Sequence, residues 1–330
     1  MHVLAGIRTE DGPSAKRWVA LGIVMMLVLA VAKGAAAAPD VLRIGYQKSS
    51  SLFIILKGQG ALEKALAPLG VTVSWHEFSS GLPLLEGVNV GSIDLTADVA
   101  DTVPLFAQAA GAHLTYLAQE TPSPAAQAIL VAKDSPITSV ADLRGRKIGL
   151  AKAAGVHYLT LRALEMAGLH LNDVQIADLQ PADGRVAFES GAIDAWAIWD
   201  PFLAAVETRS GARVLVDGTQ TGVSYRRFYL VSTAYAQSRP EVLKTVVAEL
   251  RQVGLWIKQQ PDAAARVQAG LIGLDSGTVA QANSRRSYVV APVDEAAWAE
   301  QQKIADAFTA AKLLPVALDV RASAAWHETP

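Results

Sequence analysis

The chain has 330 residues, 51% of them hydrophobic, and its 29 basic residues nearly balance its 31 acidic residues. This length predicts about two domains with cores of their own. Because the charges are not gathered in blocks, the composition excludes a nucleic-acid-binding surface. The absence of cysteine excludes disulfides and thiolate chemistry.

The N-terminal segment has the pattern of a secretory signal. Lys16 and Arg17 precede an apolar run at 18–32, and small residues follow it. The alternative is a membrane anchor, but the run is shorter than the ~20 residues that span a bilayer. We therefore predict a signal peptide at residues 1–37, cleaved after Ala36 or Ala37. Since lipidation at a mature N-terminus needs a cysteine, we expect an unlipidated protein in a Gram-negative periplasm.

Behind this segment, strand and helix patterns alternate in an α/β order. We expect strands at residues 41–46, 71–76, 93–97, 114–119, 127–131, 148–151, 174–179, 193–198 and 213–216. We expect helices at residues 52–66, 102–109, 139–145 and 182–190. We also expect one that follows the loop at 79–83 and ends at 90, one that follows the strand at 148–151 and ends at 167, and one that begins at 199–201. After residue 240 the pattern becomes purely helical, with helices at 240–258, 261–271, 276–286 and 293–311.

Two connections divide the chain into lobes. The turn-rich stretch at 121–124, TPSP, leads directly into a strand, and 228–231 has the pattern of the return connection. We therefore predict a discontinuous first lobe (38–125 and 232–330) and a second lobe (126–231). Two crossovers would allow the lobes to close about a ligand.

A repeat supports this plan. Residues 44–49, IGYQKS, recur as 148–153, IGLAKA, and 91–94, GSID, recur as 191–194, GAID. Each lysine-containing loop follows a strand and precedes a helix, the place where open α/β sheets bind ligands. The repeat predicts two loops that hold an anion between the lobes.

The sequence contains none of the common catalytic or metal-binding motifs. The six histidines have no ligand spacing, and neither a nucleophile elbow nor a phosphate-binding loop occurs. Asp98 and Asp101, three residues apart, are either paired carboxylates or a cap of the next helix. We therefore expect a binding protein rather than an enzyme, without metal or cofactor.

Several stretches together resemble one family. They include 84–95, LLEGVNVGSIDL, 104–112, PLFAQAAGA, and 194–202, DAWAIWDPF. They are similar to the periplasmic aliphatic-sulfonate-binding proteins of ABC importers, in the group that binds nitrate, sulfonate, taurine and bicarbonate. The resemblance implies a two-lobed type II periplasmic binding protein fold with two crossover hinges and a helical C-terminal tail. It also implies a monomer that binds an alkanesulfonate, taurine-like or aromatic sulfonate and delivers it to an inner-membrane ABC permease.

The resemblance also nominates ligand-binding residues. From the strand–helix loops of the family they are Gln47, Lys48, Ser49, Ser80, Gly81, Lys152, Gly155 and His157. From the other motifs they are Asp98, Asp101, Thr102, Trp199, Asp200 and Arg227. Structural roles remain open beside these: Lys152 could face solvent, and Asp200 before Pro201 could serve only as a helix cap. Of Trp196 and Trp199, we expect Trp199 to face the cleft.

Departures from the family pattern indicate an altered ligand. Asp98 and Asp101 stand where the family has small hydroxyl residues, and Ala153 and Ala154 stand where it has serines. Arg226 and Arg227 replace a Gly-Ser pair. We expect the first loop to hold the anion and the second, with Trp199, to shape the tail of a larger, aromatic or zwitterionic ligand. Alternatives are a nitrogenous ligand of the pyrimidine-precursor type, an enzyme on the same fold, and a sensor input domain.

Overall fold

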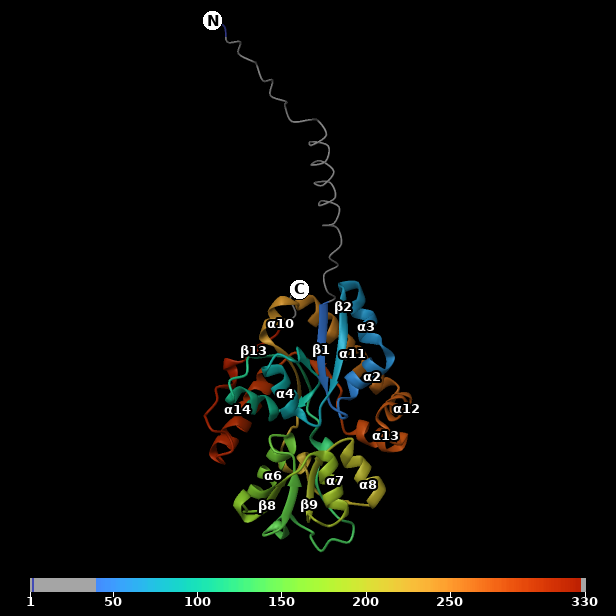
Figure 1. Cartoon of the computed structure of the whole chain (residues 1–330). Coiled ribbons are helices and arrows are strands. Elements are labelled where there is room, and N and C mark those ends of the chain that lie inside the picture. Colours follow the sequence, from blue (N-terminus) through green and yellow to red (C-terminus); the bar gives the residue numbers. More distant parts are fainter. Residues whose placement is uncertain (1, 3–39, 328–330) are drawn as a thin grey trace. The chain divides into compact units, whose positions relative to one another are not determined.

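The computed structural model describes residue 2 and residues 40–327. From Val41 onward the described residues form one compact unit that contains two sheets (Figure 1). The signal peptide predicted at 1–37 falls, apart from His2, outside the described residues. None of the helices at 40–327 combines the length and hydrophobicity needed to cross a membrane.

The first sheet has the order β12-β5-β11-β3-β1-β2, with β4 beside β11 and β13 beside β5. Its strands are β1 (Asp40–Tyr46), β2 (Val71–Glu77), β3 (Leu95–Thr96), β4 (Val99–Ala100), β5 (Leu114–Glu120), β11 (Arg227–Ser232), β12 (Val290–Ala291) and β13 (Ala324–Ala325). β1 runs parallel to β3, whereas β11 runs antiparallel to both β3 and β5. The short strands β12 and β13 correct the prediction that the chain is purely helical after residue 240.

The second sheet has the order β10-β6-β9-β7-β8. Its strands are β6 (Gln127–Val131), β7 (Lys147–Leu150), β8 (Gln175–Asp178), β9 (Ala195–Trp199) and β10 (Arg213–Asp217). β7 runs parallel to β8 and β9, and β6 runs antiparallel to β9 and β10. Each of the two sheets is therefore a mixed sheet with a parallel part, as the α/β alternation predicts.

Helices cover both sheets (Figure 1). Those that follow strands of the first sheet are α2 (Ser51–Gln59), α3 (Ala61–Leu66), α4 (Gly81–Asn89), α5 (Val103–Ala109), α10 (Thr233–Ser238), α11 (Pro240–Gln259), α12 (Pro261–Ile272), α13 (Ser276–Ser284) and α14 (Glu295–Ala310). Those of the second sheet are α6 (Gly155–Met166), α7 (Pro181–Glu189), α8 (Phe202–Ser210) and α9 (Gly218–Thr221). Short 3-10 turns lie at Ala67–Leu69, Pro124–Ala126, Val140–Leu143, Leu171–Asp173 and Val320–Ala322.

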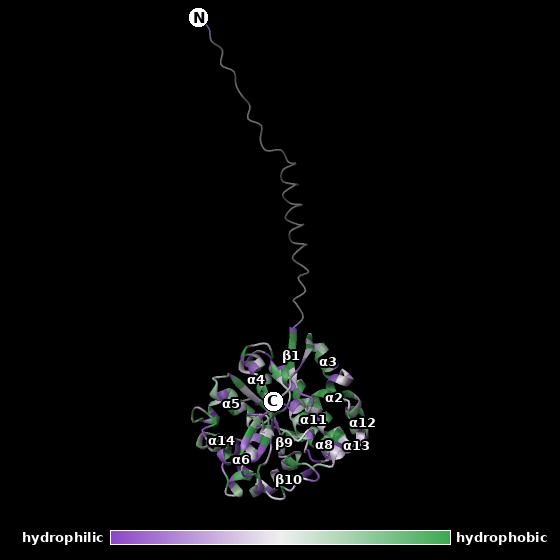
Figure 2. Ribbon diagram, turned by 60° about the horizontal axis from the view of Figure 1, so that its bottom comes forward, coloured by the Kyte–Doolittle hydropathy of each residue, from purple (hydrophilic) through white to green (hydrophobic). Residues whose placement is uncertain are grey.

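Residue chemistry explains where these helices begin and end. Gly60 adopts φ 59° and its N–H caps the carbonyls at the end of α2, so the single helix predicted at 52–66 is two helices. α11 buries residues three or four apart, from Val242 to Ile257, against the first sheet. Figure 2 shows this amphipathic pattern in the helices, where hydrophobic and hydrophilic residues alternate along the ribbon.

The connections between the sheets form a hinge of three segments. The backbone N–H of Ser123 in the first crossover donates to the carbonyl of Ser224 in the second, at 3.0 Å. Ser287, on the chain between α13 and β12, donates from its hydroxyl to Thr121 O at 2.8 Å. The first of these segments includes the turn-rich stretch predicted as a connection, and the third segment was not predicted.

One predicted boundary needs correction. β11, at 227–232, pairs with β5 over six residues and so belongs to the first sheet. The prediction assigned 228–231 to the second lobe as the return connection; that connection instead lies before Arg227. We therefore use "first lobe" for residues 40–120 and 227–327, and "second lobe" for residues 127–217.

Candidate ligand-binding site

Two cavities lie between the lobes. The inner cavity is lined from the first lobe and hinge by Gln47, Gly81, Ala100, Val103, Tyr225 and Arg227, and from the second lobe by Ala154, Gly155 and Trp199. Its free volume is about 10 Å³. The outer cavity has about 400 Å³ and is lined by Gln47, Lys48, Ser49, Glu77, Phe78, Ser79, Gln180, Pro181, Ala182, Arg185 and Phe202. Gln47 lines both cavities, so the two are adjacent.

The second lobe contributes the beginning of α6 to the inner cavity. The chain leaves β7, passes through Ala153 at φ 64°, and starts the helix at Gly155. The first N–H groups of a helix have no intrahelical acceptor, so those of Gly155 and Val156 are donors for an anion. Gly155 is required here because a Cβ would lie 2.6 Å from Cε2 of Tyr225.

His157 supports this turn from inside the protein. Its Nδ1 accepts a hydrogen bond from the N–H of Ala153 at 3.3 Å. Burial, with a smaller contribution from Lys152, lowers the pKa of His157 to about 4. The ring is therefore neutral at physiological pH and holds the loop; that it also contacts the ligand stays a prediction.

Gln127 is the polar residue that the sequence analysis missed. It begins β6, is fully buried, and neither its amide nitrogen nor its amide oxygen has a hydrogen-bond partner among the described residues. Its Oε1 lies 3.1 Å from the position of a Cβ on Gly155. A buried amide without partners is costly unless a ligand satisfies it. The available signal was a lone glutamine in the apolar strand QAILV.

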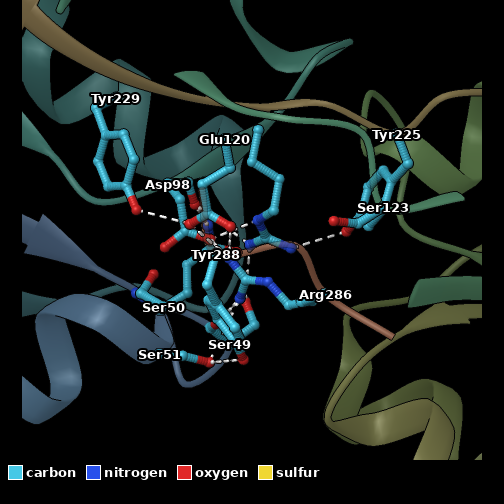
Figure 3. A network of polar contacts seen from close by, with 12 residues as sticks. Ser49, Ser50, Ser51, Asp98, Glu120, Ser123, Tyr225, Tyr229, Arg286 and Tyr288 are labelled. Atoms are coloured by element: carbon cyan, nitrogen blue, oxygen red, sulfur yellow. Dashed lines mark hydrogen bonds and ion pairs between the residues drawn. The ribbon is translucent and has the colours of Figure 1, made fainter. Parts of the chain in front are cut away.

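Behind the inner cavity lies a buried network of four charges, which we call the charge quartet: Asp98, Glu120, Arg227 and Arg286. Arg227 pairs with the Asp98 carboxylate through its Nε, and Arg286 donates to Asp98 at 3.1 Å. Arg286 also binds Glu120, with both oxygens at 2.7 Å (Figure 3). Each of the four side chains is at most 3% exposed.

The quartet is tied to the loop after β1 and to the hinge. Arg286 donates to Ser49 O at 2.9 Å, and Tyr229 donates to Glu120 at 2.7 Å. Arg227 donates from Nη1 to the hydroxyl of Tyr225 at 2.9 Å. Burial raises the pKa of Asp98 although Arg227 and Arg286 oppose the shift. The quartet thus fixes Arg227 at the cavity with its charge already balanced.

This arrangement gives Asp98 a structural role. Asp98 was predicted as a ligand contact, where a carboxylate would repel an anion or attract a cationic group, and that role stays a prediction. Its Oδ2 instead pairs with two arginines. Its backbone carbonyl faces the side chains of Gln47 and Arg227, at 3.4 Å from each nitrogen. The carboxylate therefore orients Arg227 through Oδ2, whereas its Oδ1 has no hydrogen-bond partner among the described residues.

Two further predicted residues, Asp101 and Thr102, make contacts within the hinge or between the lobes. Asp101 accepts the N–H of Arg226 at 3.0 Å, and burial, followed by the charge of Glu300, raises its pKa to about 7. Thr102 donates to Ala153 O at 2.5 Å, a hydrogen bond between the lobes. These contacts give Asp101 and Thr102 structural roles, and neither residue lines the two cavities. That they face the ligand stays a prediction.

Lys152 and Asp200 also lie away from both cavities. Lys152 is exposed and pairs with Asp178 at 3.9 Å, so the second loop of the repeat points its lysine to solvent. Asp200 accepts the N–H of Ala204 at 3.0 Å and a hydrogen bond from Arg285 at 3.3 Å. Burial raises the pKa of Asp200 to about 7, although Arg285 opposes this. For Asp200 the structure favours the role of a helix cap over that of a ligand contact.

The remaining predicted residues lie at or beside the cavities. Gln47, Gly81, Gly155, Trp199 and Arg227 line the inner one, and Lys48 and Ser49 line the outer one. Ser80 is buried at the start of α4, next to Gly81. Trp196 packs on Phe188 and Gly184 in the core of the second lobe, whereas Trp199 lies at the inner cavity.

Two α/β lobes joined by crossovers, with buried donors at the cavity between them, define a solute-binding protein of the two-lobed periplasmic type. Within 40–327 the side chains of His, Asp and Glu do not gather as metal ligands would.

Comparison with known proteins specifies the family. The model of the family described as NMT1/THI5 like matches residues 70–264. A putative aliphatic sulfonates-binding protein of Escherichia coli (strain K12) is 40% identical over 312 residues, which are 93% of this chain and 95% of that protein. A relative of that description from Bacillus subtilis (strain 168) is 32% identical over 72% of this chain and 71% of its own. The chain belongs to the NMT1/THI5-like family and, within it, to the aliphatic-sulfonate-binding proteins.

A solved structure agrees with this assignment. The alkanesulfonate-binding protein SsuA from Xanthomonas axonopodis pv. citri, bound to MOPS, superposes with a TM-score of 0.83 at 38% identity. The match covers 88% of this chain and 99% of that one. The two-lobed fold expected from the sequence is therefore confirmed.

Proposed function

We propose that this protein captures an organic sulfonate between its lobes in the periplasm and delivers it to an ABC permease of the inner membrane. It acts as a binding protein and not as an enzyme, and it works as a monomer behind a cleaved, unlipidated signal. The observation that carries the proposal is the buried, unpartnered amide of Gln127 beside Gly155, the first residue of α6, which lines the inner cavity.

The donors suit the sulfonate group. A sulfonate carries one permanent negative charge on three acceptor oxygens, so it needs several N–H donors and little net positive charge. The amide nitrogens of Gln127 and Gln47, the N–H groups that begin α6, and the guanidinium of Arg227 can supply them. Because Gln47 lines both cavities, the organic tail would extend from the inner cavity into the outer one.

Binding requires a conformational step. A free volume of about 10 Å³ is close to the smallest that holds one water molecule, so a sulfonate does not fit in the conformation described. The lobes or the ring of Tyr225 must move apart to admit it. Contacts made only when the lobes are closed would then shift the population towards the form that the permease recognises.

The outer cavity favours an organic tail with a ring over a short chain. Phe78 from the first lobe and Phe202 from the second line it, and Phe202 contacts Trp199 edge-on at 6.2 Å between ring centroids. The relative bound to MOPS shows that a member of the family holds a sulfonate with a ring. The alternative of a nitrogenous ligand rested on the carboxylates of Asp98, Asp101 and Asp200, each of which contacts an arginine residue of the protein itself. The alternative of a sensor input domain would use this same ligand-binding site.

Isothermal titration with propane-1-sulfonate, benzenesulfonate and MOPS tests the proposal. We expect binding to the wild type and a loss of ten- to about a hundredfold in Gln127→Leu, because a hydrogen bond to a charged group is worth roughly 1.5–3 kcal/mol. Urea unfolding should show Gln127→Leu to be at least as stable as the wild type, since it removes a buried amide without partners. No heat with any sulfonate would refute the proposed function.

A further inference from the structure

The outer cavity contains two cations that the sulfonate group does not use. Lys48 reaches it from the loop after β1 in the first lobe, and Arg185 reaches it from α7 in the second lobe. Glu77 is the only carboxylate among the residues that line this cavity. The lining therefore carries a net charge of +1, beside a charge quartet that is already neutral.

Both cations are available to a ligand. Lys48 is exposed and forms no ion pair with any residue at 40–327. Arg185 pairs only with Glu189, one turn along α7, at 3.0 Å. An exposed ion pair of this type contributes from a few tenths of a kcal/mol to about 1 kcal/mol to stability. A ligand can therefore replace Glu189 as the partner of Arg185 at little cost.

Glu77 is directed to other partners within the first lobe. Its Oε2 accepts a hydrogen bond from the hydroxyl of Tyr46 at 3.3 Å, and Nζ of Lys57 donates to that hydroxyl at 2.6 Å. Glu77 is therefore linked to Lys57 on α2 through the hydroxyl of Tyr46. Lys48 and Arg185 outnumber the one carboxylate that lines the cavity.

We propose that the preferred ligand is a sulfonate with a carboxylate at the far end of its tail, which Lys48 and Arg185 bind from opposite lobes. This inference rests on the proposed function, since the sulfonate group must occupy the inner cavity for the tail to reach the two cations. Because one cation belongs to each lobe, the carboxylate also favours closure of the lobes.

The test compares matched ligands by isothermal titration: propane-1-sulfonate with 3-sulfopropanoate, and benzenesulfonate with 4-sulfobenzoate. We expect the carboxylated member of at least one pair to bind about three- to tenfold more tightly at low salt, the range of one or two exposed ion pairs. That ratio should shrink when the salt concentration is raised to 0.5 M, because screening acts on exposed pairs. 3-Aminopropane-1-sulfonate, with a cationic tail, should bind more weakly than propane-1-sulfonate.

Variants assign the effect to the two cations. Lys48→Gln and Arg185→Gln should each lower the ratio of the affinity for the carboxylated ligand to the affinity for its uncarboxylated partner. The double variant should bring this ratio to one or below. Lys64→Gln, an exposed lysine on α3 that lines neither cavity, should leave the ratio unchanged. If the carboxylated ligands bind no more tightly than their partners in the wild type, the inference is wrong while the proposed function stands. If no sulfonate of either kind binds, both fail.

Discussion

The substitution Gly155→Ala tests whether the start of α6 and the ring of Tyr225 meet as closely as the structure indicates. A Cβ at this position would lie 2.6 Å and 2.9 Å from two atoms of the Tyr225 ring, and 3.1 Å from Oε1 of Gln127. The ring is 2% exposed, so it cannot swing into free space without moving its neighbours. Overpacking of this kind costs roughly 1–3 kcal/mol.

An opposing contribution makes the comparison sharp. Replacing glycine by alanine in a helix normally stabilises a protein by about 0.4–1 kcal/mol. Gly270 in α12 provides the matched control, because a Cβ there meets nothing within 4 Å. Urea unfolding should show Gly270→Ala to be more stable than the wild type and Gly155→Ala to be less stable, by up to about 2.6 kcal/mol after the two effects are summed. Titration should also show weaker sulfonate binding in Gly155→Ala. Equal stabilisation by both substitutions would mean that the contact of Gly155 with Tyr225 is absent.

Two further predictions concern buried charges. Arg286→Met leaves Asp98 and Glu120 with a single arginine, so urea unfolding at pH 7 should show a loss of roughly 3–5 kcal/mol, and a loss below 1 kcal/mol would contradict the quartet. Asp200 has a pKa raised from 3.8 to about 7, so the folded protein binds a proton more tightly than the unfolded chain, and this group makes stability fall as pH rises from about 4 to 7. Asp200→Asn keeps the acceptor for the N–H of Ala204 but removes the titrating carboxyl group. We therefore expect a flatter dependence of unfolding free energy on pH between 4 and 7. An unchanged slope would show that Asp200 is ionised as in the unfolded chain.

Much of the fold could be predicted because its signals are local. The strand at 127–131 has the predicted bounds, and other element ends differ by a few residues, since apolar alternation and proline or glycine boundaries act over short distances. The membership of β11 could not be predicted, because an apolar run does not say which sheet it joins. Its hydrogen bonds to β5 reach back more than a hundred residues along the chain.

The site divides in the same way. Gly155 could be nominated because it stands in a repeated loop at the end of a strand, and Arg227 because an arginine pair replaces the Gly-Ser pair of the family pattern. The role of Asp98 could not, because Arg286, which pairs with it, lies 188 residues further along the chain. Gln127 was missed because a glutamine at the start of a strand is usually a solvated end, and only the packing of β6 against the hinge buries it.

Comparison of the two lysine-containing loops in the sequence predicted that the first loop holds the anion and that the second shapes the pocket for the tail of the ligand. The positions suggest a different division. Lys48 of the first loop lines the outer cavity, whereas the second loop exposes Lys152 and brings the start of α6 to the inner cavity. The inner cavity thus offers amides, helix N–H groups and one arginine whose charge the quartet balances. Such a site stabilises a single delocalised negative charge. It does not compensate the much larger desolvation cost of a group with two negative charges. The electrostatics of the inner cavity therefore favour a sulfonate over sulfate or phosphate.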